Sequence, residues 1–259
     1  MLFVPLDETV SQIAAIDPDV ATPLFWQQVA AVRPDVVETI KSGVADPDKA
    51  DAIGNAIAHG KLTSMINDVP HMAEVLTAEV HNKDLPASVR CAIVGVLAYV
   101  VQPHDLIPDE APGGYGFIDD DMLLRSSLVE FLDELPPSGF DATRERNYIV
   151  LVSVFVSMDL VPLLDNALTS IVEADYRLRI VPADVLEHTM ELIIKDPLRT
   201  PLPDAPKNFT APETQHLSAA RWIGEPGGGA VLVDGSDVTV SFPGGGGVRL
   251  SGGEIVGWI

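Results

Sequence analysis

Residues 99–124, YVVQPHDLIPDEAPGGYGFIDDDMLL, decide the fold of this chain. One apolar helical pattern leads into the stretch and a second pattern leads out of it. Between these patterns lie three prolines and three glycines, which favour turns over regular structure. The stretch therefore predicts two helices joined by an irregular turn. The turn and the start of the second helix are acidic, with carboxylates at Asp105, Asp109, Glu110, Asp119, Asp120 and Asp121.

Helical patterns also flank this stretch on both sides. Apolar residues recur at helical spacing, and proline or glycine separates one pattern from the next. Thr22-Pro23 reads as a helix start, Gly60 as a helix end and Asp68-Val69-Pro70 as a break. The sequence thus predicts a mainly α protein, a multi-helix domain with a central helical hairpin. The expected helices are 8–16, 22–33, 36–43, 46–60, one or two in 61–82, 86–102, 119–135, 142–161, 163–178 and 183–195.

Composition after residue 196 changes from helical to β. Six of the 21 prolines fall in 197–226, and glycine-rich turns then separate short apolar runs such as Val231–Val233 and Val238–Phe242. These features predict a proline-rich linker and a small C-terminal antiparallel β element, a meander of four strands. We therefore expect three parts: an all-α domain at 1–196 with its hairpin at 85–135, the linker at 197–226, and the β meander at 227–259.

The formal net charge of −22 narrows the classes of partner. Non-specific binding to nucleic acid or to an anionic membrane requires an excess of Lys and Arg, so neither is expected. A strongly acidic protein instead suits a basic partner or divalent cations. We therefore predict a protein partner that is basic or donates a β-strand to the exposed sheet edge, and no nucleic-acid partner.

Two absences point to a cytoplasmic protein. The single cysteine, Cys91, excludes a disulfide framework within the chain, which fits a reducing compartment. The longest apolar run, 148–158, is too short to cross a bilayer, which takes about 20 residues. We therefore expect no transmembrane segment and a cytoplasmic location.

The central stretch resembles the YkvA-like family, domain of unknown function 1232, over about residues 85–135. That family has an apolar helix, a Pro-x-Asp-Leu-Ile-Pro-Asp run, then Pro, Gly and an Asp-Asp pair that opens a second helix. The chain departs from the pattern at His104, where the family usually has a small apolar residue, and in a longer interval from Pro112 to Gly116. The resemblance implies a helical hairpin with a fixed turn and no established activity. The matching residues are Pro103, Asp105, Leu106, Ile107, Pro108, Asp109, Pro112, Gly116, Asp119 and Asp120.

Three roles remain open for the carboxylates of the turn. In a structural role, Asp105 and Asp109 accept hydrogen bonds from turn amides, and Asp119 with Asp120 caps the second helix. In a metal-binding role, Asp105, Asp109, Asp119 and Asp120 would hold Mg²⁺, Mn²⁺ or Ca²⁺, because these hard cations prefer oxygen ligands. In the third role, the turn recognises a partner protein.

These alternatives lead to two predicted functions. The favoured one is a non-enzymatic acidic interaction or scaffold protein that needs no cofactor, so no catalytic residue is assigned. Its motif residues are then turn-forming: Pro103, Asp105, Pro108, Asp109, Gly116, Asp119 and Asp120. The alternative is a divalent-metal-binding protein, or a metal-dependent hydrolase in which His104 serves as a base.

Overall fold

The computed structural model describes the helical part of the chain and the backbone of a short sheet. The described residues are 1–43, 49–102, 106–131, 145, 149, 155–157, 159–160, 163–164, 177–197, 230–234, 237–241, 247–251 and 254–258.

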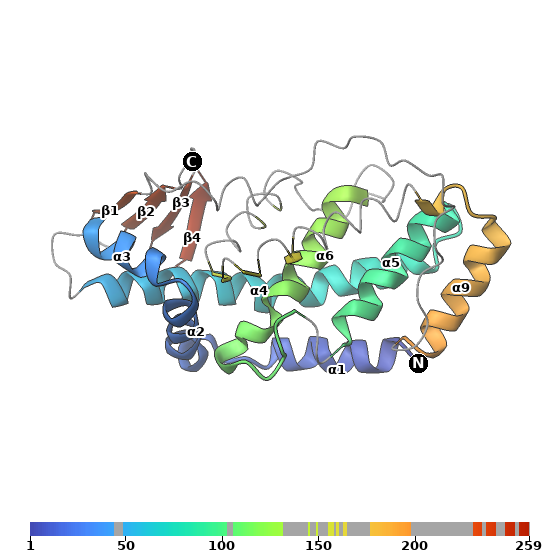
Figure 1. Cartoon of the computed structure of the whole chain (residues 1–259), viewed down its shortest axis with the longest axis horizontal. Coiled ribbons are helices and arrows are strands. Elements are labelled where there is room, and N and C mark those ends of the chain that lie inside the picture. Colours follow the sequence, from blue (N-terminus) through green and yellow to red (C-terminus); the bar gives the residue numbers. More distant parts are fainter. Residues whose placement is uncertain are drawn as a thin grey trace.

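The helical part confirms that the protein is mainly α. Figure 1 shows its helices arranged around one long helix, α4. Among the described residues, the helices are α1 Phe3–Ala14, α2 Pro18–Val32, α3 Pro34–Gly43, α4 Ala50–Val80, α5 Ala87–Val100, α6 Ile118–Phe131 and α9 Ala183–Lys195, with a 3₁₀ helix, η2, at Pro112–Phe117.

Helix α4 is continuous over 31 residues, so the predicted helix end at Gly60 and the predicted break at Asp68-Val69-Pro70 are both wrong. A proline inside a helix removes one hydrogen bond and costs about 3 kcal/mol. The packing of α4 offsets that cost, because the helix contacts α1, α2, α3, α5 and α6. Gly60 and Val69 themselves are buried in these contacts. Tertiary packing therefore overrides the local signals.

Helix α2 also differs from the prediction at its start. The helix begins at Pro18, where Asp17 caps it by accepting a hydrogen bond at Oδ1 from the Asp19 amide, at 3.0 Å. Pro23 lies inside the helix rather than at its first turn. The Thr22 hydroxyl donates to the Pro18 carbonyl at 2.6 Å, a bond within the helix rather than a cap. The sequence Asp17-Pro18 is thus the true start signal.

Helices α5 and α6 lie against α4 and contact each other. Eleven of the fourteen residues of α5 are buried, because α1, α4, α6 and α9 surround it. Helix α9 lies at the outer end of the molecule, beside α5 (Figure 1). The turn between α5 and α6 is therefore anchored on two helices of the core.

Near the C-terminus the structure has four short strands, β1 Ala230–Asp234, β2 Asp237–Ser241, β3 Gly247–Ser251 and β4 Glu254–Trp258. They pair antiparallel in the order β1-β2-β3-β4, with a register shift at Arg249 and Leu250. Only the backbone of these strands is described, so the predicted β meander as a separate part stays a prediction. The predicted linker from residue 198 onward, and most of the helix predicted at 142–161, lie outside the described residues.

Among the helices described, none has both the length and the apolar character that crossing a membrane requires.

Candidate functional site

The turn between α5 and α6 is described from residue 106 onward. Pro103, His104 and Asp105 lie outside the described residues. The predicted roles of Pro103 in the turn, of His104 as a base and of Asp105 as a metal ligand therefore stay predictions.

Gly116 lets the turn close tightly on itself. A Cβ atom at this position would lie 2.5 Å from the Pro108 carbonyl oxygen and 2.7 Å from the Cα atom of Asp109. The same Pro108 oxygen accepts a hydrogen bond from the Ala111 amide at 2.9 Å. Any side chain at residue 116 would push the Pro108–Ala111 turn away from η2.

Gly113 sets how the turn meets α2. Its φ of 69° lies in the left-handed region, which favours glycine. A Cβ atom there would lie 2.5 Å from the backbone nitrogen of Phe25. The turn thus packs closely against the backbone of α2, and the aromatic ring of Tyr115 meets that of Phe25 edge-on at 5.6 Å between centroids.

Asp119 ties the turn to both helices of the pair. Its side chain is fully buried in the first turn of α6, at 0% exposure. Oδ2 accepts hydrogen bonds from the Tyr99 hydroxyl of α5 at 2.8 Å and from the Ile107 amide at 3.3 Å. The Tyr99 oxygen in turn accepts from the Leu106 amide at 3.2 Å. One carboxylate therefore joins α5, α6 and the start of the turn.

Burial changes the acidity of this carboxylate. Removal from water raises the pKa of Asp119 to about 6, although the hydrogen bond from Tyr99 acts in the opposite direction. The nearby Asp109 charge adds to the rise. Asp119 thus titrates close to neutral pH instead of remaining fully ionised at mildly acidic pH.

Asp120 and Asp109 complete the described part of the predicted acidic cluster. Asp120 is fully buried beside Asp119, whereas Asp109 is partly exposed in the turn. Asp120 lies with Asp119 and Asp121 in the first turn of α6, where the positive end of the helix favours negative charge. The acidic run of α6 therefore lies in the interior of the protein and not on an open surface.

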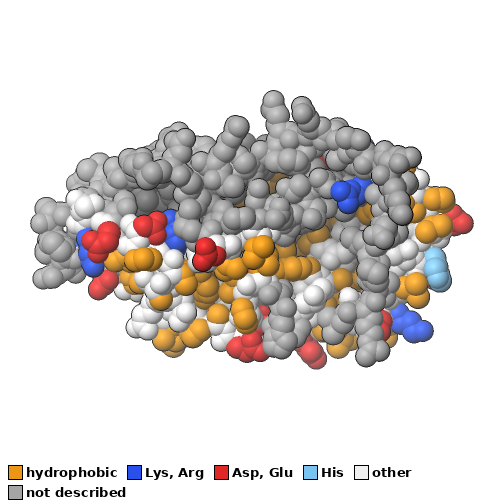
Figure 2. All heavy atoms as spheres, viewed as in Figure 1, with side chains coloured by type: hydrophobic (Ala, Val, Ile, Leu, Met, Phe, Trp, Pro, Cys, Tyr) orange, Lys and Arg blue, Asp and Glu red, His pale blue; other side chains and the backbone are white. Residues whose placement is uncertain are grey.

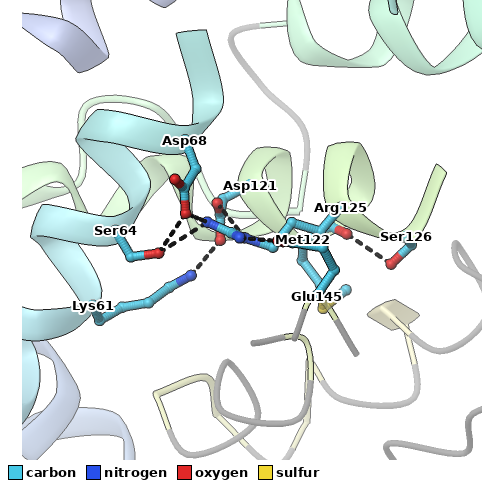
Figure 3. A network of polar contacts seen from close by, with 8 residues as sticks. All are labelled: Lys61, Ser64, Asp68, Asp121, Met122, Arg125, Ser126 and Glu145. Atoms are coloured by element: carbon cyan, nitrogen blue, oxygen red, sulfur yellow. Dashed lines mark hydrogen bonds and ion pairs between the residues drawn. The ribbon is translucent and has the colours of Figure 1, made fainter. Parts of the chain in front are cut away.

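Asp121, the third member of this run, belongs to a buried ionic network that we call the α4–α6 network (Figure 3). The network consists of Lys61, Ser64 and Asp68 of α4, Asp121 and Arg125 of α6, and Glu145.

Both oxygens of Asp121 are bound by cations of the protein. Lys61 Nζ binds Oδ2 in a short ion pair, and Arg125 Nε donates to Oδ1 at 2.9 Å. The Lys61, Asp121 and Arg125 side chains are all 0% exposed. Each charge is therefore compensated by protein groups at a place that the described structure shuts off from water.

Arg125 is the central residue of the α4–α6 network, because it binds residues of both helices and Glu145. Its Nη2 atom donates to Ser64 Oγ at 3.0 Å and to Asp68 Oδ2 at 2.8 Å, and its Nη1 atom donates to Glu145 in a short ion pair. Ser64 itself donates to Asp68 at 2.9 Å. One guanidinium thereby joins α6 to α4 and to Glu145.

The pKa shifts in the network reflect competition between burial and charge. Burial lowers the pKa of Lys61, and the neighbouring Asp121 carboxylate opposes this change. Burial alone would raise the pKa of Asp121, but the charges of Arg125 and Lys61 hold it below its usual value. The pKa of Arg125 is raised by Asp121 and Glu145 against the effect of burial. Asp121 and Arg125 therefore stay ionised at neutral pH.

The α4–α6 network was not predicted from the sequence, although two signals of it are present there. Lys61, Ser64 and Asp68 recur at intervals of three and four on a face of α4 that also buries Leu62, Met65 and Val69. Asp121 and Arg125 are spaced four apart on α6. Polar residues at helical spacing within an apolar helix indicate buried partners. The partners themselves come from sequence positions about 60 residues apart, which spacing cannot relate.

The metal-binding role finds no complete site in the described part of the chain. No group of three or more His, Cys, Asp or Glu residues there is arranged to hold a metal ion. Asp119 and Asp120 are adjacent and buried, but Asp105, the fourth ligand of the predicted set, lies outside the described residues. The predicted Mg²⁺, Mn²⁺ or Ca²⁺ site therefore stays a prediction.

Among the comparisons with known proteins, one gives a match, and this match lies at the turn between α5 and α6. No curated protein and no solved structure matches the chain. The family model described as "Protein of unknown function (DUF1232)" matches residues 89–124. That range runs from α5 through the turn and η2 into the first half of α6, and it ends next to Arg125. Residues 89–124, which include Asp119 and Asp121, are thus a DUF1232 segment.

Proposed function

We propose that this protein is a non-enzymatic interaction protein that binds a basic protein partner. In this proposal the DUF1232 segment has a structural role, because its carboxylates join helices inside the protein. The proposal is supported by the direction in which the acidic side chains at the start of α6 point. Asp119 and Asp121 point into the protein and hold Tyr99, the Ile107 amide, Lys61 and Arg125. Carboxylates used in this way join helices, whereas a hydrolase needs carboxylates that face a substrate.

The balance of exposed charge supports a basic partner. Among the described residues of the helices and their turns, fourteen Asp and Glu side chains are exposed, whereas only six Lys and Arg side chains are exposed. Four further cations, Arg33, Lys61, Arg90 and Arg125, are buried and add nothing to the surface. Figure 2 shows the acidic side chains spread over the visible face and not gathered in one patch. Such a surface attracts a basic partner at long range.

We propose two further properties that rest on sequence alone. The single cysteine favours a cytoplasmic location, and the likeness of the turn to YkvA-like proteins extends to about residues 85–135. A strand-donating partner at the edge of the C-terminal sheet is a narrower form of the same interaction function.

Calorimetric titration tests the proposal against its metal-dependent alternative. Purified protein is titrated with Mg²⁺, Mn²⁺ and Ca²⁺, and then with a lysine-rich peptide and a glutamate-rich peptide of equal length. We expect no stoichiometric metal binding, and binding of the lysine-rich peptide alone that weakens as salt is raised. The matched variant is Asp119→Asn with Asp120→Asn, checked for intact folding by circular dichroism.

The result that overturns the proposal is equally specific. Stoichiometric metal binding that disappears in the double variant would replace it with the metal-binding alternative and justify a hydrolase screen. Equal binding of both peptides, or binding that does not change with salt, would remove the basic partner.

A further inference from the structure

Helix α9 buries only three of its thirteen residues, whereas α5 buries eleven of its fourteen. It packs mainly on α5, and it lies at the outer end of the molecule (Figure 1). Proline precedes it at residue 182 and follows it at residue 197, so the helix is bounded at both ends. Among the described residues, a backbone hydrogen bond from the Leu2 amide to the Ile194 carbonyl, at 2.6 Å, also joins α9 to the rest of the protein. A helix attached along one face opens more readily than the core helices.

The contact face of α9 has a defined chemical pattern. Leu186, Met190 and Ile193 are 2%, 3% and 1% exposed and follow the spacing of one helix face. Glu187, next to this face, is 39% exposed and accepts hydrogen bonds from Arg90 Nη1 at 3.3 Å and from Lys83 Nζ at 3.1 Å. The bonds from Arg90 and Lys83 hold the pKa of Glu187 below its usual range.

The surface beneath α9 combines an oriented arginine with apolar side chains. Arg90 of α5 is 5% exposed, and its Nε atom donates to the Leu85 carbonyl at 3.3 Å, which fixes the direction of the guanidinium. Arginine presents its donors as a rigid fork that suits a carboxylate. Helix α5 carries buried apolar residues on nearly all of its sides. Loss of α9 would therefore expose apolar surface next to the oriented guanidinium of Arg90.

We propose that α9 is a releasable cap on α5, and that the face of α5 beneath it binds an amphipathic acidic helix of a partner protein. The partner helix would copy α9, with apolar residues at i, i+4 and i+7 and a carboxylate at i+1. The cap competes with the partner within the same chain, so it lowers the apparent affinity by the fraction of molecules that are open. This inference rests on the proposed interaction function but concerns another face and another partner charge.

The charge of Glu187 gives a way to open the cap in the full-length protein. Glu187→Arg places a cation opposite Arg90 and Lys83 and does not change the apolar residues on the contact face of α9. Glu191→Arg, one turn later on the same helix and exposed, is the matched control with the same change of charge. Hydrogen exchange then compares protection in α9 with protection in α4, and circular dichroism verifies the fold.

Binding is measured by fluorescence anisotropy with a labelled peptide of residues 182–197. We expect Glu187→Arg to lose protection in α9 alone and to bind the peptide about tenfold more tightly than the wild type and Glu191→Arg do. The same peptide carrying Glu187→Arg should bind the opened variant more weakly than the unchanged peptide does, because it lacks the carboxylate that Arg90 and Lys83 bind.

Either of two results would overturn the proposal: α9 remains as protected in Glu187→Arg as in the wild type, or α9 opens and the peptide still does not bind. If Glu187→Arg fails to fold, Glu187→Gln repeats the test with a smaller gain in affinity, about threefold. The assay contains no basic partner and no metal, so its failure leaves the proposed function untouched.

Discussion

Replacement of Lys61 is the sharpest test of the α4–α6 network. Lys61→Met keeps most of the side-chain volume and removes the ammonium group, so that Asp121 retains Arg125 as its cation. Both Lys61 and Asp121 are 0% exposed, and water cannot take the place of the lost charge. Breaking a buried pair by removing one partner costs about 3–5 kcal/mol. We expect the free energy of unfolding to fall by about that amount.

A double-mutant cycle separates the ion pair from general damage to the core. Asp121→Asn should cost about 3–5 kcal/mol as well, because it leaves Lys61 buried without its counter-charge. The double variant should then be more stable than the sum of the single changes predicts, by about 1–3 kcal/mol. Urea denaturation at pH 7 provides the free energies, provided that the slope with denaturant is unchanged.

The exposed pair Lys41–Glu38 supplies the control for this cycle. These side chains are 46% and 72% exposed and lie 3.2 Å apart, so Lys41→Met should cost at most about 0.5 kcal/mol. The reasoning would be refuted if Lys61→Met cost no more than Lys41→Met, or if the changes at Lys61 and Asp121 were additive. Either result would mean that water reaches the pair.

Three further predictions concern the turn. First, because the folded-state pKa of Asp119 is raised to about 6 from an ordinary 3.8, folding takes up a proton between these values. This group's contribution is fully present below pH 3.8 and is lost as pH rises to about 6, so the stability of the wild type relative to Asp119→Asn should fall by roughly 3 kcal/mol over that window in urea titrations. A flat difference would contradict the assignment. Second, Tyr99→Phe removes a hydrogen bond that lowers the pKa of Asp119, so it should move that midpoint to higher pH and cost about 1–2 kcal/mol at pH 7; an unchanged midpoint in the same titration would show that the bond is absent in solution. Third, Gly116→Ala should cost at least about 2 kcal/mol in thermal or urea unfolding, because its Cβ atom would lie 2.5 Å from the Pro108 oxygen; wild-type stability would show that the turn adjusts freely.

The sequence predicted the class of the fold. Apolar spacing gave the helical class and the helix at 183–195, which the structure has as Ala183–Lys195. Local signals failed in α4, where Gly60 and Pro70 lie inside one helix. Glycine and proline weaken a helix by fixed local amounts, whereas burial against five neighbouring helices depends on the whole fold. Spacing along the chain therefore could not decide where α4 ends.

The site shows the same division between local and distant information. The motif pointed to Asp119 and Asp120, but a list of carboxylates does not say whether they face water or the core. Their burial depends on α4, α5 and η2 closing around the first turn of α6. Lys61 was missed because its partner lies 60 residues away in the sequence. The role of Asp119 as a link between Tyr99 and Ile107 likewise needed three-dimensional coordinates.

The distance along the chain between Lys61 and Asp121 has a consequence for synthesis on the ribosome. At about 5–20 residues per second, Lys61 leaves the ribosome roughly 3–12 s before Asp121 does. During that interval α4 lacks its counter-charge and the apolar face of α6, and for the first part of it α4 also lacks α5, which ends at Val100. A nascent chain arrested between these two residues would expose Leu62, Met65 and Val69 beside a solvated ammonium.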